Sequence, residues 1–197
     1  MPAVALVDLD GTLADYDGAM LRDMSALAGP NEEDYLPYTR SSKPYIISRE
    51  NLIKRIPGWW SSLHPIEENM ALVHAMKDIG FCIHILTKGP SSKSQAWAEK
   101  VEWTRKWLPF ASITVTEDKQ LVYGKILFDD FPEYQERWLK FRPRGLGIVP
   151  LKESNKHFKH PNVVFYDGKN LREIKEMLQE VYRKSLEKDN TNNEPKI

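Results

Sequence analysis

Asp8 and Asp10 form an Asp-x-Asp-Gly motif directly after a short apolar run, and Asp129 and Asp130 follow a second such run. Runs of this kind are typical of strands buried in a parallel sheet, and open parallel sheets bind ligands at their carboxyl edge. At this spacing, Asp8 could act as a nucleophile or metal ligand while Asp10 handles a proton. Clustered carboxylates repel one another unless a cation neutralises them, and Mg²⁺ prefers oxygen ligands. The four aspartates therefore predict a magnesium site at a sheet edge.

Thr87 and Lys119 add two groups that a phosphate site needs. Thr87 ends an apolar run and offers a hydroxyl donor, and Lys119 precedes the second aspartate pair and offers a positive charge. Phosphoryl transfer depends mainly on positioning and charge neutralisation, which such groups supply. Taken singly, an aspartate pair is typical of a solvated turn, a threonine of a helix cap and a lysine of the surface. Their joint occurrence, each at or near an expected strand end, favours a phosphate-processing site.

Apolar runs that alternate with helical patterns indicate the elements that would hold these residues. The alternation predicts an α/β fold with a Rossmann-like, mostly parallel sheet flanked by helices. The helical patterns are amphipathic, and Gly80 is a natural stop for the first of them. The expected strands are 3–7, 81–86, 113–115, 126–128, 146–149 and 163–166, and the expected helices are 65–79, 91–108 and 171–182.

The segment 16–65 interrupts this alternation. It contains one helix face that ends at Gly29-Pro30, a short helical pattern at 52–56, and no clear strand that would continue the sheet. Because the segment lies between the first two strands, we expect a small, mainly helical cap inserted after the first strand. Residues 1–15 and 66–187 would then form the α/β core, and the polar residues 188–197 a disordered tail.

The composition narrows the classes of function. The chain has 197 residues, 28 of them basic and 28 acidic, so its formal net charge is zero. This balance argues against a general nucleic-acid-binding surface, although it is compatible with a local basic pocket. No stretch approaches the ~20 apolar residues of a membrane span, and the first residues do not resemble a secretory leader. Cys82, the only cysteine, lies in an apolar run, so we expect a buried thiol and a cytoplasmic location.

The motifs in this order resemble those of the haloacid dehalogenase superfamily of phosphohydrolases. The first motif of that superfamily is seen in Asp8-Leu9-Asp10-Gly11-Thr12, the second in Thr87, the third in Lys119 and the fourth in Asp129-Asp130. Within the superfamily, the chain is similar to the 5'(3')-deoxyribonucleotidase family over about residues 4–134. The stretches that carry this closer likeness are 8–16, 59–66, 99–103, 116–119 and 127–130.

The resemblance implies a magnesium-dependent phosphomonoesterase that dephosphorylates (deoxy)nucleoside monophosphates through an aspartyl-phosphate. Asp8 would attack phosphorus, and Asp10 would protonate the leaving oxygen and later activate water. Mg²⁺ would be held by Asp8, the backbone carbonyl of Asp10 and Asp130, with Asp129 in its outer shell or supporting Lys119.

The phosphate oxygens would be held by Thr87 and Lys119. Lys88 stands where the family usually has a serine near the phosphate, so it could add a phosphate contact or narrow the substrate range. The stretch 35–48 also departs from the family's cap, and the cap is the part that would set substrate preference.

Tyr16, Trp59 and Trp60 are candidates to stack on or line a nucleobase, although tryptophans commonly fill protein cores. Three other functions remain open: a phosphatase for another small phosphate ester, a 3'-phosphatase for nucleic-acid ends, and a catalytically silent nucleotide-binding protein. We expect a small-molecule substrate rather than nucleic acid or a membrane as the partner, and the aromatic content makes a homodimer plausible.

Overall fold

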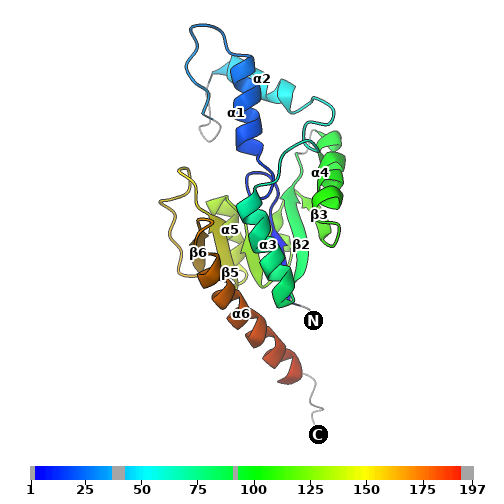
Figure 1. The fold of residues 1–197 in the computed structure, drawn as a ribbon, viewed down its shortest axis with the longest axis vertical. Helices are drawn as coiled ribbons and strands as arrows, with labels where there is room; N and C mark the ends of the chain where they lie inside the picture. The colour runs from blue at the N-terminus through cyan, green and yellow to red at the C-terminus, as the bar shows by residue number, and fades with distance from the viewer. Residues whose placement is uncertain (1–2, 37–42, 91–92, 192–197) are drawn as a thin grey trace.

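A parallel sheet of six strands forms the centre of the molecule, with helices around it (Figure 1). The structure is a computed structural model that describes residues 3–36, 43–90 and 93–191. The strands are β1 (Val4–Val7), β2 (Cys82–Lys88), β3 (Ser112–Thr116), β4 (Ile126–Phe128), β5 (Leu146–Pro150) and β6 (Val163–Tyr166). The helices are α1 (Tyr16–Ala26), α2 (Pro44–Ile53), α3 (Glu67–Ile79), α4 (Ser94–Trp107), α5 (Pro132–Lys140) and α6 (Leu171–Thr191), with a 3₁₀ turn η1 at Lys119–Leu121.

The sheet confirms the expected α/β fold, and each expected strand is present. The strand order is β3-β2-β1-β4-β5-β6, and every pairing between these strands is parallel. The first strand therefore lies between the second and the fourth, so that the residues following β1, β2 and β4 meet at one edge.

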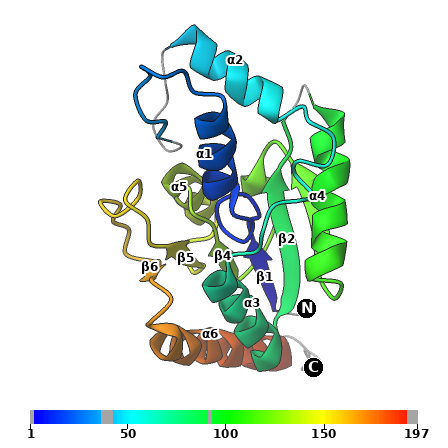
Figure 2. The ribbon, with the colours of Figure 1, turned by 45° about the horizontal axis from the view of Figure 1, so that its top comes forward.

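Helices cover both faces of the sheet, because alternate strand residues point to opposite faces. Ala5 and Val7 belong to the larger apolar cluster, which includes residues of α3, α4 and α6. Leu6 belongs to a smaller cluster with Trp138 and Leu139 of α5. Figure 2 shows α5 on the face of the sheet opposite α3 and α6. This two-sided burial explains why the strands are almost continuously apolar.

Three helices differ from the sequence expectation. Helix α5 is not predicted, because its nine residues are mostly polar and only a narrow stripe reaches the core. Helix α2 begins at Pro44, well before the expected pattern at 52–56, with proline in the favoured first turn. Helix α6 continues to Thr191, so residues 188–191 are helical where a disordered tail was expected. Residues 192–197 of that tail lie outside the described part of the chain.

The expectation of a buried Cys82 is wrong: this thiol is exposed. Cys82 is the first residue of β2, and the alternation of side chains directs Ile83 into the core and Cys82 outward.

Helices α1 and α2 both lie within 16–65, beyond the carboxyl ends of the strands (Figures 1 and 2). The chain leaves and re-enters the sheet region side by side, with an antiparallel bridge between Ala14 and Pro65. The amide of Asp15 donates to the carbonyl of His64 at 2.8 Å, which fixes the base of this segment. Across the described residues, no helix is long and apolar enough to span a bilayer.

Helix α6 supplies a test of the larger apolar cluster. We expect Leu178→Ala to lower the free energy of unfolding by about 2–5 kcal/mol, because Leu178 is fully buried and its truncation leaves a cavity. Met177 is the neighbouring residue and is 44% exposed, so Met177→Ala should change the same quantity by no more than about 0.5 kcal/mol. Urea unfolding followed by circular dichroism measures both. Equal losses from the two variants would contradict this packing.

Candidate active site

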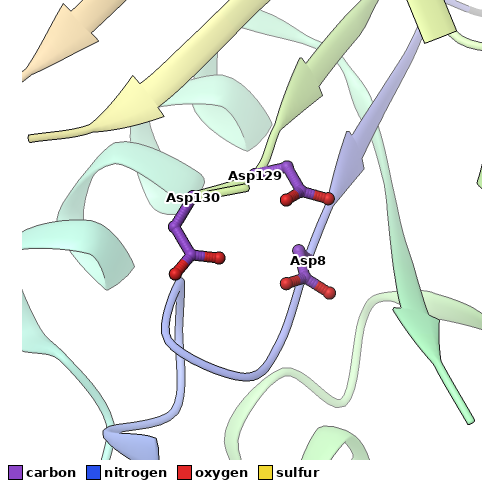
Figure 3. Close-up of side chains that lie close together, drawn as sticks. All are labelled: Asp8, Asp129 and Asp130. Atoms are coloured by element: carbon purple, nitrogen blue, oxygen red, sulfur yellow. The ribbon is translucent and has the colours of Figure 1, made fainter. Parts of the chain in front are cut away.

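Asp8, Asp129 and Asp130 converge at the carboxyl edge of the sheet (Figure 3). Asp8 follows β1 and the pair follows β4, and these strands are paired with Val7 opposite Phe128. One ligand oxygen from each carboxylate lies within 4.8 Å of the others. The structure thus brings together three of the four aspartates that the sequence predicts to share a site, and Asp10 is not part of this cluster.

Lys119 lies between two of these carboxylates. Its Nζ is 2.6 Å from Asp8 Oδ1 and 2.7 Å from Asp129 Oδ2, and the side chain is 3% exposed. Burial opposes the charge of this lysine, but the carboxylates of Asp129 and Asp8 outweigh burial and raise the pKa of Lys119. Asp129 also accepts the amide of Phe131 at 2.9 Å on its other oxygen. Both oxygens of Asp129 therefore have partners and the residue is fully buried, whereas the side chain of Asp130 is 21% exposed. Asp8 and Asp130 are thus better placed than Asp129 to hold a cation directly.

The electrostatics of the cluster favour a bound cation. Burial raises the pKa of Asp129 to about 7, Lys119 opposes that rise, and the charges of Asp8 and Asp130 add to it. Burial also raises the pKa of Asp130. Both shifts come first from burial and are increased by the neighbouring carboxylates, so the ionised forms are disfavoured, and a divalent cation would stabilise them. The donors are all oxygen atoms, which fits Mg²⁺.

Asp10 is held by Lys100, a residue of α4 that the sequence analysis gave no role. Lys100 is 1% exposed, and its Nζ donates to Asp10 Oδ2, to Thr87 Oγ1 at 3.2 Å and to the carbonyl of Lys88 at 2.6 Å. The other oxygen of Asp10 is buried and has no hydrogen-bond partner among the described residues. One oxygen of Asp10 is thus fixed, and the other remains available to a reacting group.

Periodicity could have revealed Lys100. It lies four residues after the buried Ala96 and three before the buried Trp103, on the inner face of α4. The neighbouring Glu99 was also missed; it is buried and accepts the amides of Gly58 at 2.8 Å and Trp60 at 2.9 Å. Two adjacent charged residues in a helix commonly lie on its solvent-exposed face. Only the helical spacing indicates that Glu99 and Lys100 are buried.

A pocket of about 920 Å³ joins this cluster to the segment 16–65. Its wall includes most of the sequence-predicted site residues, namely Asp8, Asp10, Tyr16, Trp60, Lys88, Lys119 and Asp130. Trp59 and Thr87 are not part of that wall. Thr87 is fully buried behind it, and its hydroxyl accepts the hydrogen bond from Lys100.

The aromatic residues form a compact group beside the catalytic end of the pocket. Tyr16 and Trp60 are stacked, with ring centroids 5.6 Å apart and an interplanar angle of 29°. Trp59 contacts both rings edge-on, and its indole N–H donates to Asp23 at 2.7 Å. The structure therefore presents Tyr16 and Trp60 to the pocket and uses Trp59 to support them.

The fold is that of haloacid dehalogenase-like hydrolases. A haloacid dehalogenase family hydrolase from Deinococcus radiodurans has the same fold, with a TM-score of 0.56 and 12% identity over 91% of this chain and 96% of that one. A haloacid dehalogenase-like hydrolase from Burkholderia xenovorans has a TM-score of 0.51 and 14% identity over 89% and 97% of the two chains.

The family can be stated more narrowly. Residues 2–185 match the family model described as 5' nucleotidase, deoxy (pyrimidine), cytosolic type C protein, and the chain belongs to this family. The human cytosolic-type 5'(3')-deoxyribonucleotidase is 27% identical over 140 residues, which are 64% of this chain and 69% of the human protein. The resemblance inferred from the motifs is thereby confirmed.

Lys119 offers a test of the buried charge cluster. Without metal at pH 8, we expect Lys119→Met to lower the free energy of unfolding by about 3–5 kcal/mol, because two buried carboxylates lose their counter-ion. The loss should be smaller at pH 5, since a proton on Asp129 removes one of the unpaired charges. Chemical denaturation in EDTA measures this effect.

The control is Lys184→Met, because the Lys184 side chain is 63% exposed and its ion pair with Glu180 lies at the surface. Its effect should be at most about 1 kcal/mol at either pH. A Lys119 variant as stable as this control would contradict the proposed burial of charge.

Proposed function

We propose that the chain is a magnesium-dependent phosphomonoesterase that hydrolyses (deoxy)nucleoside monophosphates. The observation that carries the proposal is the convergence of Asp8, Asp10, Lys119 and Asp130 in one pocket of a chain from a deoxynucleotidase family. The human relative is named a 5'(3')-deoxyribonucleotidase of the cytosolic type, and we infer a similar substrate class and a cytosolic location here.

The reaction has two steps at phosphorus. In the first, a carboxylate oxygen of Asp8 bonds to phosphorus, the bond to the sugar oxygen breaks, and Asp10 gives its proton to that leaving oxygen. In the second, Asp10 takes a proton from water, the resulting hydroxide attacks phosphorus, and Asp8 is released with inorganic phosphate. Splitting hydrolysis in this way replaces one difficult step by two easier ones. The partner-free Oδ1 of Asp10 supports its role in moving the proton.

Mg²⁺ bound to Asp8, Asp130 and the backbone carbonyl of Asp10 would neutralise charge on the phosphate as it is transferred. Asp129 would contribute from the outer shell, since it is fully buried and lies outside the pocket wall that Asp8 and Asp130 line, and it holds Lys119.

The remaining polar groups bind the phosphate and orient the acid. Lys119 is in contact with Asp8 and lines the pocket, so it holds a phosphate oxygen beside the nucleophile. Lys88 lines the same pocket and adds a second positive charge. The oxygen of Thr87 accepts a hydrogen bond from Lys100, so the hydroxyl proton of Thr87 is free to be donated to a phosphate oxygen. Lys100 fixes Asp10 and thereby positions the proton.

The aromatic wall supplies the preference for a nucleotide. Tyr16 and Trp60 line the pocket with apolar surface, and a nucleobase has a flat face that stacks on such rings. Trp59 holds the other two rings in place from behind. One chain supplies every residue of this scheme, so the mechanism requires no homodimer.

The nucleophile and the metal can be tested together. We expect phosphate release from deoxynucleoside 5'- and 3'-monophosphates with Mg²⁺, none in EDTA, and a loss of at least about 10³-fold in kcat for Asp8→Asn, because the amide cannot form the covalent intermediate. Asp78→Asn, at an exposed position of α3, is the matched control and should retain wild-type turnover.

The substrate panel should include ribonucleotides, sugar phosphates and a 3'-phosphorylated oligonucleotide. Release from sugar phosphates alone would leave the phosphatase chemistry and reject the nucleotide proposal. Release from the oligonucleotide alone, with strong salt dependence, would favour the nucleic-acid 3'-phosphatase. Tight nucleotide binding without any phosphate release would favour a silent binding protein.

Tyr16 tests the proposed base contact. We expect Tyr16→Leu to raise KM for nucleoside monophosphates by about tenfold or more, because base–aromatic stacking is worth about 1–3 kcal/mol. The KM for ribose 5-phosphate, which has no base, should be unchanged. Tyr123 is 50% exposed and lies outside the pocket wall, so Tyr123→Leu is the control for a general effect of losing a tyrosine. Equal increases in KM for both substrates would argue against base stacking by Tyr16.

A further inference from the structure

Lys152 joins the segment 16–65 to the acidic cluster through one ammonium group. It lies in the loop between β5 and β6, and its Nζ is 2.8 Å from Asp17 Oδ2 and 2.9 Å from Asp130 Oδ2. Asp17 is in the first turn of α1, whereas Asp130 follows β4. The side chain of Lys152 is 23% exposed, so this bridge is largely shielded from water.

The loop that carries Lys152 is built onto the backbone of Asp130. The amide of Lys152 donates to Asn155 Oδ1 at 2.8 Å. The side-chain amide of Asn155 donates in turn to the carbonyls of Asp130 at 3.0 Å and Pro150 at 2.9 Å. Asn155 is 3% exposed, and buried hydrogen bonds of this kind are costly to break. These hydrogen bonds fix the loop backbone from which the Lys152 side chain extends.

The same ammonium group packs over the turn that follows the nucleophile. Gly11 has a φ of +74°, and a Cβ at this position would lie 2.9 Å from Lys152 Nζ and 2.6 Å from Asp130 Oδ2. Glycine is thus needed there both for the backbone conformation and for the close approach of these two groups. Lys152 therefore lies against Asp130 of the acidic pair, the turn at Gly11 and Asp17 of α1.

Charge balance explains why a lysine is needed. At the acidic end of the pocket, the ion pairs involve five carboxylates and three ammonium groups, so the carboxylates are in excess even with Lys152 present. The carboxylates are Asp8, Asp10, Asp17, Asp129 and Asp130, and the ammonium groups are Lys100, Lys119 and Lys152.

We propose that Lys152 is a positioning residue that fixes the carboxylate of Asp130 and ties it to Asp17. The inference rests on the magnesium site of the proposed function. Thr12 donates to the other oxygen of Asp130 at 3.3 Å, a long hydrogen bond that would not fix the carboxylate alone. Lys152 supplies the second point of attachment and so keeps Asp130 in one orientation. Since Asp17 directly follows Tyr16, the bridge also fixes the start of the aromatic wall.

Removing the ammonium charge of Lys152 should change turnover and Mg²⁺ affinity in opposite directions. The ammonium group lies next to a metal-binding carboxylate, so it competes with Mg²⁺ for that group and repels the ion. Removing the ammonium charge should therefore strengthen Mg²⁺ binding. Turnover should nevertheless fall, because an Asp130 free to rotate misplaces the reacting groups. General damage to the fold would weaken both quantities, so the opposite signs identify positioning.

The test compares Lys152→Met with Lys152→Arg in the full chain. We expect Lys152→Met to lower kcat by about tenfold or more at saturating Mg²⁺, because small misplacements at a reacting centre are costly. Calorimetry without substrate should show Mg²⁺ binding about threefold tighter or more. Lys152→Arg keeps the charge and should recover most of the turnover. Asp17→Asn should lower kcat less, and the double variant Asp17→Asn with Lys152→Met should be no slower than Lys152→Met.

Lys156→Met is the matched control, because Lys156 lies in the same loop and pairs only with Glu153 in the described structure. It should keep the wild-type kcat and Mg²⁺ affinity. Lys152→Met with wild-type kcat, or with unchanged or weaker Mg²⁺ binding, would overturn the inference while the wild-type activity still supports the proposed function. A wild-type protein without magnesium-dependent phosphate release would reject the proposed function, and the calorimetric comparison would still decide the role of Lys152.

Discussion

Mutual repulsion among buried carboxylates is the constraint around which the active site is organised. Asp8, Asp129 and Asp130 lie close together, and burial with neighbouring negative charge raises the pKa values of Asp129 and Asp130, which disfavours their ionised forms. The protein offsets this cost with lysines from separate elements: Lys119 from η1 contacts the first two, and Lys152 contacts the third. Neutralisation therefore also joins parts of the chain that are distant in sequence.

These ion pairs do not explain the stability of the fold. Burying a charge has a large desolvation cost, and the attraction between partners often no more than repays it. The two apolar clusters on opposite faces of the sheet provide the favourable energy, with strands such as β1 fully enclosed. A well-packed sheet of this kind can hold an electrostatically unfavourable cluster of carboxylates at the carboxyl ends of its strands, where there is room for a ligand.

Helix α4 connects the two ends of the pocket. Lys100 holds Asp10, the acid and base of the proposed mechanism, and the adjacent Glu99 accepts the amides of Gly58 and Trp60 beside the aromatic residues of the pocket. Lys100 also lies over the ring of Trp60, 4.8 Å from its centroid. Consecutive residues of one helix thus set the position of the acid and that of the substrate wall. A shift of α4 would disturb both, so the proposed mechanism couples recognition of the base to proton transfer.

The sequence by itself determined the α/β fold, the strand positions and the four motifs, because a buried parallel strand and a glycine turn leave strong local patterns. Only the tertiary structure decided which charged residues serve the site. Lys100, Lys152 and Asp17 lie in segments with many polar residues. The pairs Lys100–Asp10, Lys152–Asp130 and Lys152–Asp17 are separated by 90, 22 and 135 positions along the chain. The tertiary structure likewise separated Tyr16 and Trp60, which face the pocket, from Trp59, which supports them. Periodicity can place Lys100 on the inner face of α4, but which carboxylate a lysine meets depends on how the elements pack, and local sequence patterns do not contain that information.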